Sequence, residues 1–453
     1  MSTAYAFTHP GGGAVQVPAH ERVVLPNGIT LLIVPCRDVP LLAFQAVLRG
    51  GPLGDTKPGV ASLVAGLLEK GAGSRDAFAF ADAVEGAGGN FSVATGTEAL
   101  SVSGQFLARD QALVIELLAD ALLRPRFDPA EFEKLRARRI ELIKAAKDSD
   151  PAEVMGTYGR AFLFGSHPYS RPATGSEASL ASVTHQDVLD YYDAHVGADR
   201  LILVFAGDVD VPALERDVLA AFGDWRKAAA PPVALTEPQK ARGRRVLLVD
   251  SPESTQTYFW IANVGVNKRY PEHAALDLVN TLYGGRFTSL LNTELRIRSG
   301  LSYGARAGFT RGTAAGEFAI RSFVDTENTG KALDLSLDTL TRLKRTGVTA
   351  DMLDSARAYV LGQYPLNFET AADWAAALAE LEFYELGSDY IDQYATKLRE
   401  VTLPAARAVI DTSFPNAEDV SMVLIGDAAA IRNVARNYGP LSEMSITEPT
   451  FTP

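Results

Sequence analysis

A buried-strand pattern that occurs twice constrains the fold of this chain more than any other feature. Leu201 to Gly207 form an uninterrupted apolar run, and a second run ending at Gly426 repeats it. These two glycines lie 219 positions apart (426 − 207). Pro58 and Pro271, each ahead of an expected helix, lie 213 apart (271 − 58). Offsets this similar predict a duplicated unit of roughly 210–220 residues, far longer than a solenoid repeat.

Each half is predicted to mix strands and helices in a similar order. Alternating apolar residues indicate strands, and apolar residues three or four apart indicate helices. In the first half we expect strands at residues 22–34, 43–49, 90–95 and 99–106, and helices at 58–71, 75–87, 111–123 and 129–146. This order predicts an α+β fold in which helices cover one face of a largely antiparallel sheet.

The boundary between the halves is expected in an alanine- and proline-rich stretch. Residues 228–241 have the composition of an exposed linker. The predicted organisation is therefore an N-terminal half at 1–227, with a flexible start to about residue 20, this linker, and a C-terminal half at 242–453.

Composition excludes several classes of protein. The net charge of −12 opposes nucleic-acid binding, and no apolar run is long enough to span a membrane. The single cysteine, Cys36, cannot form an internal disulfide or a thiolate cluster. Residues 1–18 lack the hydrophobic core of a signal peptide. That fits a cytoplasmic protein, and equally a secreted one whose signal has been removed.

Residues 58–71 predict an amphipathic helix with an unusual second face. Apolar residues recur three and four apart and form one stripe. The other face carries only the small side chains of Ser62, Ala65 and Gly66.

This helix resembles the zinc-binding helix of the pitrilysin and mitochondrial-processing-peptidase family, which reads roughly G-x-A-H-x-x-E-H-x-x-x-K-G. The resemblance puts Ser62 and Gly66 at the histidine positions and Ala65 at the glutamate. Residues 132–142 are similar to the family's later ligand helix, with Leu142 at the third ligand position and Leu135 at an earlier acidic one. Inverzincins need the H-x-x-E-H set for zinc and the general base, so the resemblance implies a degenerate site that binds no metal.

A second resemblance lies in the C-terminal half. The glycine turn Gly284-Gly285 is followed by Leu295-Arg296 and then Leu301-Ser-Tyr303, which is similar to the family's L-R-x-x-x-x-L-x-Y. In that family the arginine and tyrosine form a substrate-binding pair across a cavity from zinc. The resemblance therefore implies that Arg296 and Tyr303 bind a peptide and stabilise its carbonyl, because both donate hydrogen bonds.

Local geometry is compatible with that pair. Arg296 is expected near the end of a helix that Gly300 stops, and a strand is expected from Leu301 onward. Residues alone leave an alternative open, in which Glu294 pairs with Arg298 at i,i+4 and Arg296 is simply solvated.

Two functions remain from these observations. In the first, the chain is the non-metal subunit of a heteromeric zinc peptidase, inactive alone. A homologous partner subunit then supplies H-x-x-E-H and zinc, in a heterodimer or higher assembly. The resemblance also implies that the two halves of this chain enclose a cavity. In the second, it is a structural or binding subunit with no proteolytic role, similar to respiratory core subunits of this fold.

Two smaller expectations complete the sequence reading. Leu142 and Leu135 are expected to close the space beside Ser62, Ala65 and Gly66, since an empty apolar hole costs about 24 cal/mol per Å³. The periplasm is the expected compartment by resemblance to bacterial relatives, with the cytoplasm as the alternative.

Overall fold

A computed structural model describes residues 15–453 of the chain, so residues 1–14 of the predicted flexible start lie outside the described residues. The described part folds into two compact units that do not follow the chain linearly. The first comprises residues 15–140, 173–234 and 364–393; the second comprises 141–172, 235–363 and 394–453.

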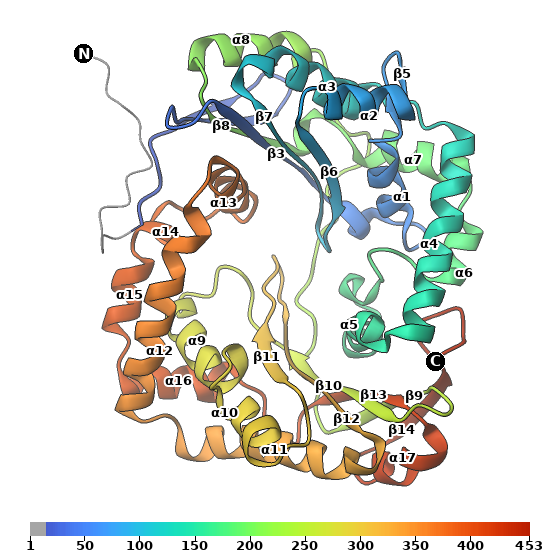
Figure 1. Ribbon diagram of the computed structural model, residues 1–453, viewed down its shortest axis with the longest axis vertical. Helices are drawn as coiled ribbons and strands as arrows, with labels where there is room; N and C mark the ends of the chain where they lie inside the picture. Colours follow the sequence, from blue (N-terminus) through green and yellow to red (C-terminus); the bar gives the residue numbers. More distant parts are fainter. Residues whose placement is uncertain (1–14) are drawn as a thin grey trace. The chain divides into compact units, whose positions relative to one another are not determined.

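The first unit is built on a six-stranded sheet with the order β1-β2-β8-β3-β7-β6 (Figure 1). Its strands are β1 (Glu21–Val24), β2 (Thr30–Pro35), β3 (Leu41–Arg49), β6 (Asn90–Thr95), β7 (Ala99–Leu107) and β8 (Leu201–Gly207). Every neighbouring pair is antiparallel except β2 and β8. A minor two-stranded sheet joins β4 (Gly71–Ala72) to β5 (Arg75–Asp76).

The second unit repeats this topology. Its sheet has the order β14-β9-β13-β10-β12-β11, and its five strands from β9 to β11 match β2-β8-β3-β7-β6 in order and in direction. The strands are β9 (Arg245–Asp250), β10 (Gln256–Val264), β11 (Ala305–Phe309), β12 (Glu317–Asp325), β13 (Ser421–Gly426) and β14 (Leu441–Ser445). The α+β class and the two similar halves are confirmed.

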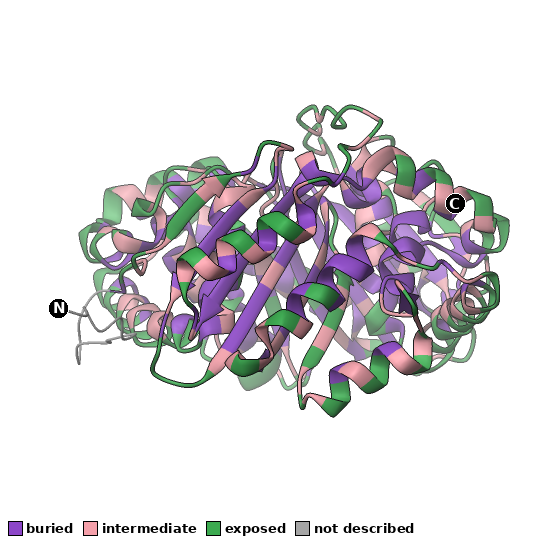
Figure 2. Cartoon of the chain, turned by 90° about the horizontal axis from the view of Figure 1, so that it is seen from above, coloured by how far each residue is buried: buried purple, intermediate pink, exposed green. Residues whose placement is uncertain are grey.

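Helices cover both faces of the first sheet, because a helix distant in sequence adds a second layer. All seven residues of β8 are buried. Its even-numbered residues pack with Trp374 and Leu378 of α13 (Ala371–Phe383). Odd-numbered residues point to the opposite face, where Phe205 contacts Phe44. Buried residues accordingly concentrate on the strands, and exposed residues on the outward sides of the helices (Figure 2).

The remaining helices complete each unit. Those assigned to the first are α1 (Val60–Leu67), α2 (Ala77–Gly86), α3 (Gln111–Leu123), α6 (Glu177–Ser182), α7 (His185–His195), α8 (Val211–Phe222) and α14 (Asp389–Asp392). Those of the second are α5 (Pro151–Phe164), α9 (His273–Asn280), α10 (Leu290–Asn292), α11 (Thr329–Thr346), α12 (Ala350–Gln363), α15 (Tyr394–Glu400), α16 (Leu403–Ser413) and α17 (Ala428–Arg436). Helix α4 (Pro129–Ser149) passes from one unit to the other.

Candidate functional site

Helix α1 carries the positions that correspond to a metal-binding face. Asp55 fixes its start, because the two carboxylate oxygens accept hydrogen bonds of 2.8 Å from the backbone N–H groups of Gly59 and Ala61. Gly59 has φ +99°, a left-handed conformation that glycine adopts without strain. The regular helix is therefore shorter than expected. All eight of its residues are buried.

An arginine from α4 fills the space beside this face. The Arg139 guanidinium donates a hydrogen bond to Ser62 Oγ. A Cβ atom added to Gly66 would lie 2.6 Å from Arg139 Nη2 and 2.8 Å from Leu135 Cδ2. Burial lowers the pKa of Arg139, and the neighbouring Glu69 carboxylate opposes that shift. Because arginine is not deprotonated in proteins, a fixed positive charge stands at this wall.

The packing expectation is correct for Leu135 and wrong for Leu142. Leu142 is 57% exposed, so it does not close a buried space. Arg139 lies four residues after Leu135 and three before Leu142, which puts it on the same helical face as Leu135. A charged side chain with a long apolar stem fills the gap that we assigned to a second leucine.

The residues at this wall do not fit zinc. Serine, alanine, glycine and leucine offer none of the imidazole, thiolate or carboxylate ligands that zinc takes. Arg139 adds a positive charge where a cation would bind. Between residues 15 and 453, no group of three or more His, Cys, Asp and Glu side chains is placed to hold a metal.

The segment with Arg296 and Tyr303 follows the glycine turn. Gly284 and Gly285 end a π-helix, η5 (Thr281–Gly285), and Arg296 lies on a second one, η6 (Thr293–Arg298). Gly300 has φ +66° and ends this helical segment as expected. The following strand begins at Ala305, so the strand expected from Leu301 starts four residues late.

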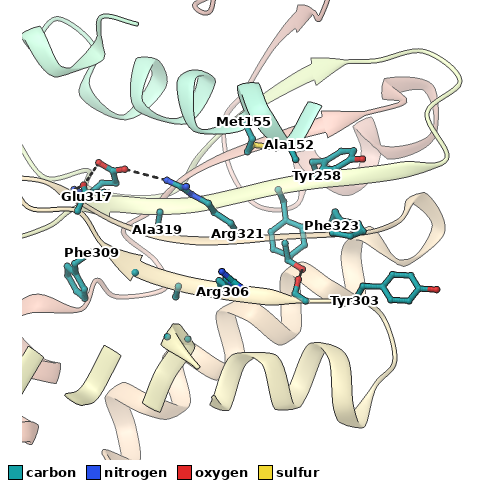
Figure 3. Close-up of a pocket in the computed structure, with 18 residues that line it drawn as sticks. Ala152, Met155, Tyr258, Tyr303, Arg306, Phe309, Glu317, Ala319, Arg321 and Phe323 are labelled. Atoms are coloured by element: carbon teal, nitrogen blue, oxygen red, sulfur yellow. Dashed lines mark hydrogen bonds and ion pairs between the residues drawn. The ribbon is translucent and has the colours of Figure 1, made fainter. Parts of the chain in front are cut away.

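Both members of the expected pair are exposed. The Arg296 guanidinium lies 4.8 Å from the centre of the Phe287 ring. Tyr303 is 81% exposed, and Figure 3 shows its ring directed away from the pocket arginines. No hydrogen bond or ring contact joins Arg296 to Tyr303 in the part of the chain that the structure describes. Glu294 pairs with Arg298 at 2.8 Å, as in the alternative reading of the sequence, and also with Arg342.

A pocket of about 650 Å³ opens beside Tyr303, entirely within the second unit. Its walls come from the start of α5, from β10, β11 and β12, and from the glycine turn (Figure 3). Gly284 must be small here, because a Cβ atom would lie 2.4 Å from the backbone nitrogen of Ala307. The charged lining residues are Arg306, Arg321 and Glu317.

The sequence did not point to three arginines that shape these two sites. Arg139 could have been found by its spacing from Leu135, whereas Arg306 and Arg321 need the strand register. His167 is a satisfied loop residue, because its Nδ1 accepts from the Tyr169 backbone N–H and its Nε2 lies 2.9 Å from the Thr236 carbonyl.

Comparison with known proteins places the chain in one family. Residues 50–172 match the family described as insulinase (peptidase family M16), and residues 182–360 match the one described as peptidase M16 inactive domain. The chain belongs to peptidase family M16. The suspected resemblance is thereby confirmed at the level of the family.

Individual relatives extend over most of the chain. A Mycobacterium tuberculosis protein named as an uncharacterized zinc protease is 25% identical over 398 residues, 86% of this chain and 90% of that protein. A Helicobacter pylori protein named non-peptidase homolog YmxG is 24% identical over 372 residues, 81% of this chain and 82% of the relative. The solved peptidase M16 inactive domain from Pseudomonas fluorescens shares the fold, with TM-score 0.84, 23% identity and coverage of 94% of this chain and 100% of that one.

The family and the local chemistry together define the chain as an M16 homologue in which the described residues hold no peptidase metal set. Among residues 15–453, no helix is both long and apolar enough to cross a membrane.

Proposed function

We propose that this chain is the non-metal subunit of a heteromeric zinc peptidase, in which it binds the substrate peptide through Arg296 and Tyr303. A homologous partner subunit would bring the H-x-x-E-H helix, the zinc ion and the activated water. This chain would bring hydrogen-bond donors for the peptide carbonyl, whose oxygen gains negative charge during attack.

The observation that carries the proposal is the contrast within one M16 chain. The α1 wall is filled by Arg139 and has no ligand set, so hydrolysis cannot be assigned to it. The donors on the other segment remain available: Tyr303 is exposed, and among residues 15–453 Arg296 has only a ring partner. The H. pylori relative is likewise named a non-peptidase homolog.

The test is reconstitution with a zinc-bearing M16 homologue from the same source. Neither chain alone should cleave a quenched fluorescent peptide at the rate of the mixture. Arg296→Ala and Tyr303→Phe should each lower turnover by roughly 100-fold, the typical effect of removing one oxyanion donor, while gel filtration still shows the complex. Arg345→Ala, an exposed arginine on α11, is the matched control.

If both variants keep the turnover of the unsubstituted complex, the chain belongs instead with structural or binding subunits that have no proteolytic role. A stable complex whose cleavage rate equals that of the zinc-bearing chain alone would lead to the same conclusion.

A further inference from the structure

Two arginines face each other across neighbouring strands in the pocket of the second unit. Arg306 on β11 and Arg321 on β12 are direct cross-strand partners in the antiparallel register. Directly opposed residues project from the same face of a sheet, with Cβ atoms about 4.5–5.5 Å apart. Like charges in that position repel each other. A pair of this kind weakens the sheet unless an anion lies between or above the two guanidinium groups.

The protein itself supplies only part of the negative charge that this pair of arginines needs. Glu317 is 3% exposed and lies 3.5 Å from Arg321 and 3.8 Å from Arg160 of α5. Its other oxygen accepts a hydrogen bond of 2.7 Å from Thr310 Oγ1. Arg306 has no carboxylate or ring partner among residues 15–453. The lining arginines and Glu317 leave a formal charge of +1, and Arg160 beside Glu317 adds a further positive charge, so the site attracts an anion.

The rest of the lining suits the neighbourhood of a carboxylate in a peptide. Arg306 and Arg321 are both exposed, Arg321 with 49% of its side chain, so a ligand can reach them. Tyr258 and Phe323 lie on the same face, with ring centres 5.6 Å apart, and Met155 of α5 adds an apolar wall (Figure 3). A volume of about 650 Å³ is in the range of ligand pockets.

We propose that this pocket is a carboxylate-binding subsite, in which Arg306 and Arg321 hold an acidic side chain or the C-terminal carboxylate of a peptide. The peptide as the carrier of the carboxylate rests on the proposed function; the anion site itself rests on the geometry of the two arginines. The chain would then prefer acidic peptides, with apolar neighbours of the carboxylate packed against the aromatic wall.

The test measures binding to the full chain alone, so that it needs neither a partner nor catalysis. Three fluorescein-labelled probes share the sequence Ala-Ala-Leu-X-Leu-Ala-Ala: X is Glu or Gln with an amidated C-terminus, or Gln with a free C-terminus. Fluorescence anisotropy gives the Kd of each at low and at physiological salt. We expect at least one carboxylate probe to bind tenfold or more tightly than the amidated Gln probe, and the preference to shrink with salt.

Substitutions that each remove one charge test whether the probes bind at this pocket. Arg306→Gln and Arg321→Gln should each reduce the preference to less than threefold, whereas Arg345→Gln, an equal change of charge on α11, should preserve it. Glu317→Gln removes the competing carboxylate and should strengthen binding of the preferred probe. Loss of preference without a lowered melting temperature separates a ligand site from a structural role.

The outcomes divide cleanly. A preference for the internal Glu probe identifies the acidic side chain, and one for the free C-terminus identifies the terminal carboxylate; either supports the subsite. Equal binding of all probes overturns it, as does a preference that survives both arginine variants. Because cleavage is not measured, failure of partner-dependent hydrolysis would leave this result intact, and the reverse also holds.

Discussion

Arginine does opposite things in the two units of this protein. At the α1 wall of the first unit, Arg139 is half-buried, donates to Ser62, and takes up the space beside Gly66. In the pocket of the second unit, Arg306 and Arg321 are exposed, opposed to one another, and only partly neutralised by Glu317. Arginine therefore fills the space at the first site and remains accessible to a ligand at the second. The comparison teaches that burial and partners, not residue type, decide whether a charge is structural or available to a ligand.

The largest expected effect is overpacking at the closed wall. Gly66→Leu should destabilise the first unit by about 3 kcal/mol, because the new side chain meets Arg139 and Leu135 in a filled space. Urea unfolding followed by circular dichroism, with hydrogen exchange of α1 as the local readout, measures the change. Gly86→Leu is the matched control, since that helical glycine is exposed and has nothing within 4 Å of its Cβ position. Equal effects of the two substitutions would show that the α1 wall is not filled.

Removing the arginine should cost somewhat less. Arg139→Ala deletes the hydrogen bond to Ser62 and the packed stem, and we expect a loss of about 2 kcal/mol in the free energy of unfolding. Arg138→Ala, one position away on the exposed side of α4, should change it little. The double variant Gly66→Leu with Arg139→Ala sharpens the comparison: truncating Arg139 makes room for leucine, so the combined loss should be smaller than the sum of the single losses. Additive losses would contradict the contact between these two positions.

The smallest effect should come from the open pocket, and with the opposite sign. Arg306→Gln relieves the repulsion across β11 and β12 and should stabilise the second unit by about 0.3 kcal/mol. Thermal unfolding in low salt measures it, and the gain should fall as salt screens the charges. A clear loss of stability would make Arg306 a structural residue like Arg139 and remove the difference between the two regions.

The sequence was sufficient for the fold and for one side of the candidate site. The repeated buried strand and the offset between Pro58 and Pro271 predict the duplicated sheets, because a run such as Leu201–Gly207 is apolar enough to be buried on both faces. The spacing of apolar residues predicted that Ser62, Ala65 and Gly66 share one helix, but not that all eight residues of this helix are buried.

The remainder depends on contacts that spacing does not encode. The prediction assigned this space to Leu142 and so missed Arg139. The family pattern identifies the ligand positions, but not which residue fills the space when the ligands are absent. The pairing of Arg306 with Arg321 depends on the register of β11 against β12. A shift of one residue would send one of the two side chains to the other face. The roles of Arg296 and Tyr303 stay predictions, to be decided by the reconstitution experiment.

The distant origin of α13 affects how the protein can be made. The inner strand β8 ends at Gly207, yet the helix that covers one of its faces begins at Ala371, 164 positions later (371 − 207). At a synthesis rate of about 5–20 residues per second, this face of β8 stays uncovered for roughly 10–30 s, until α13 has been synthesised. Newborn chains of this protein therefore pass through an interval of exposed apolar surface, during which they are natural clients for chaperones.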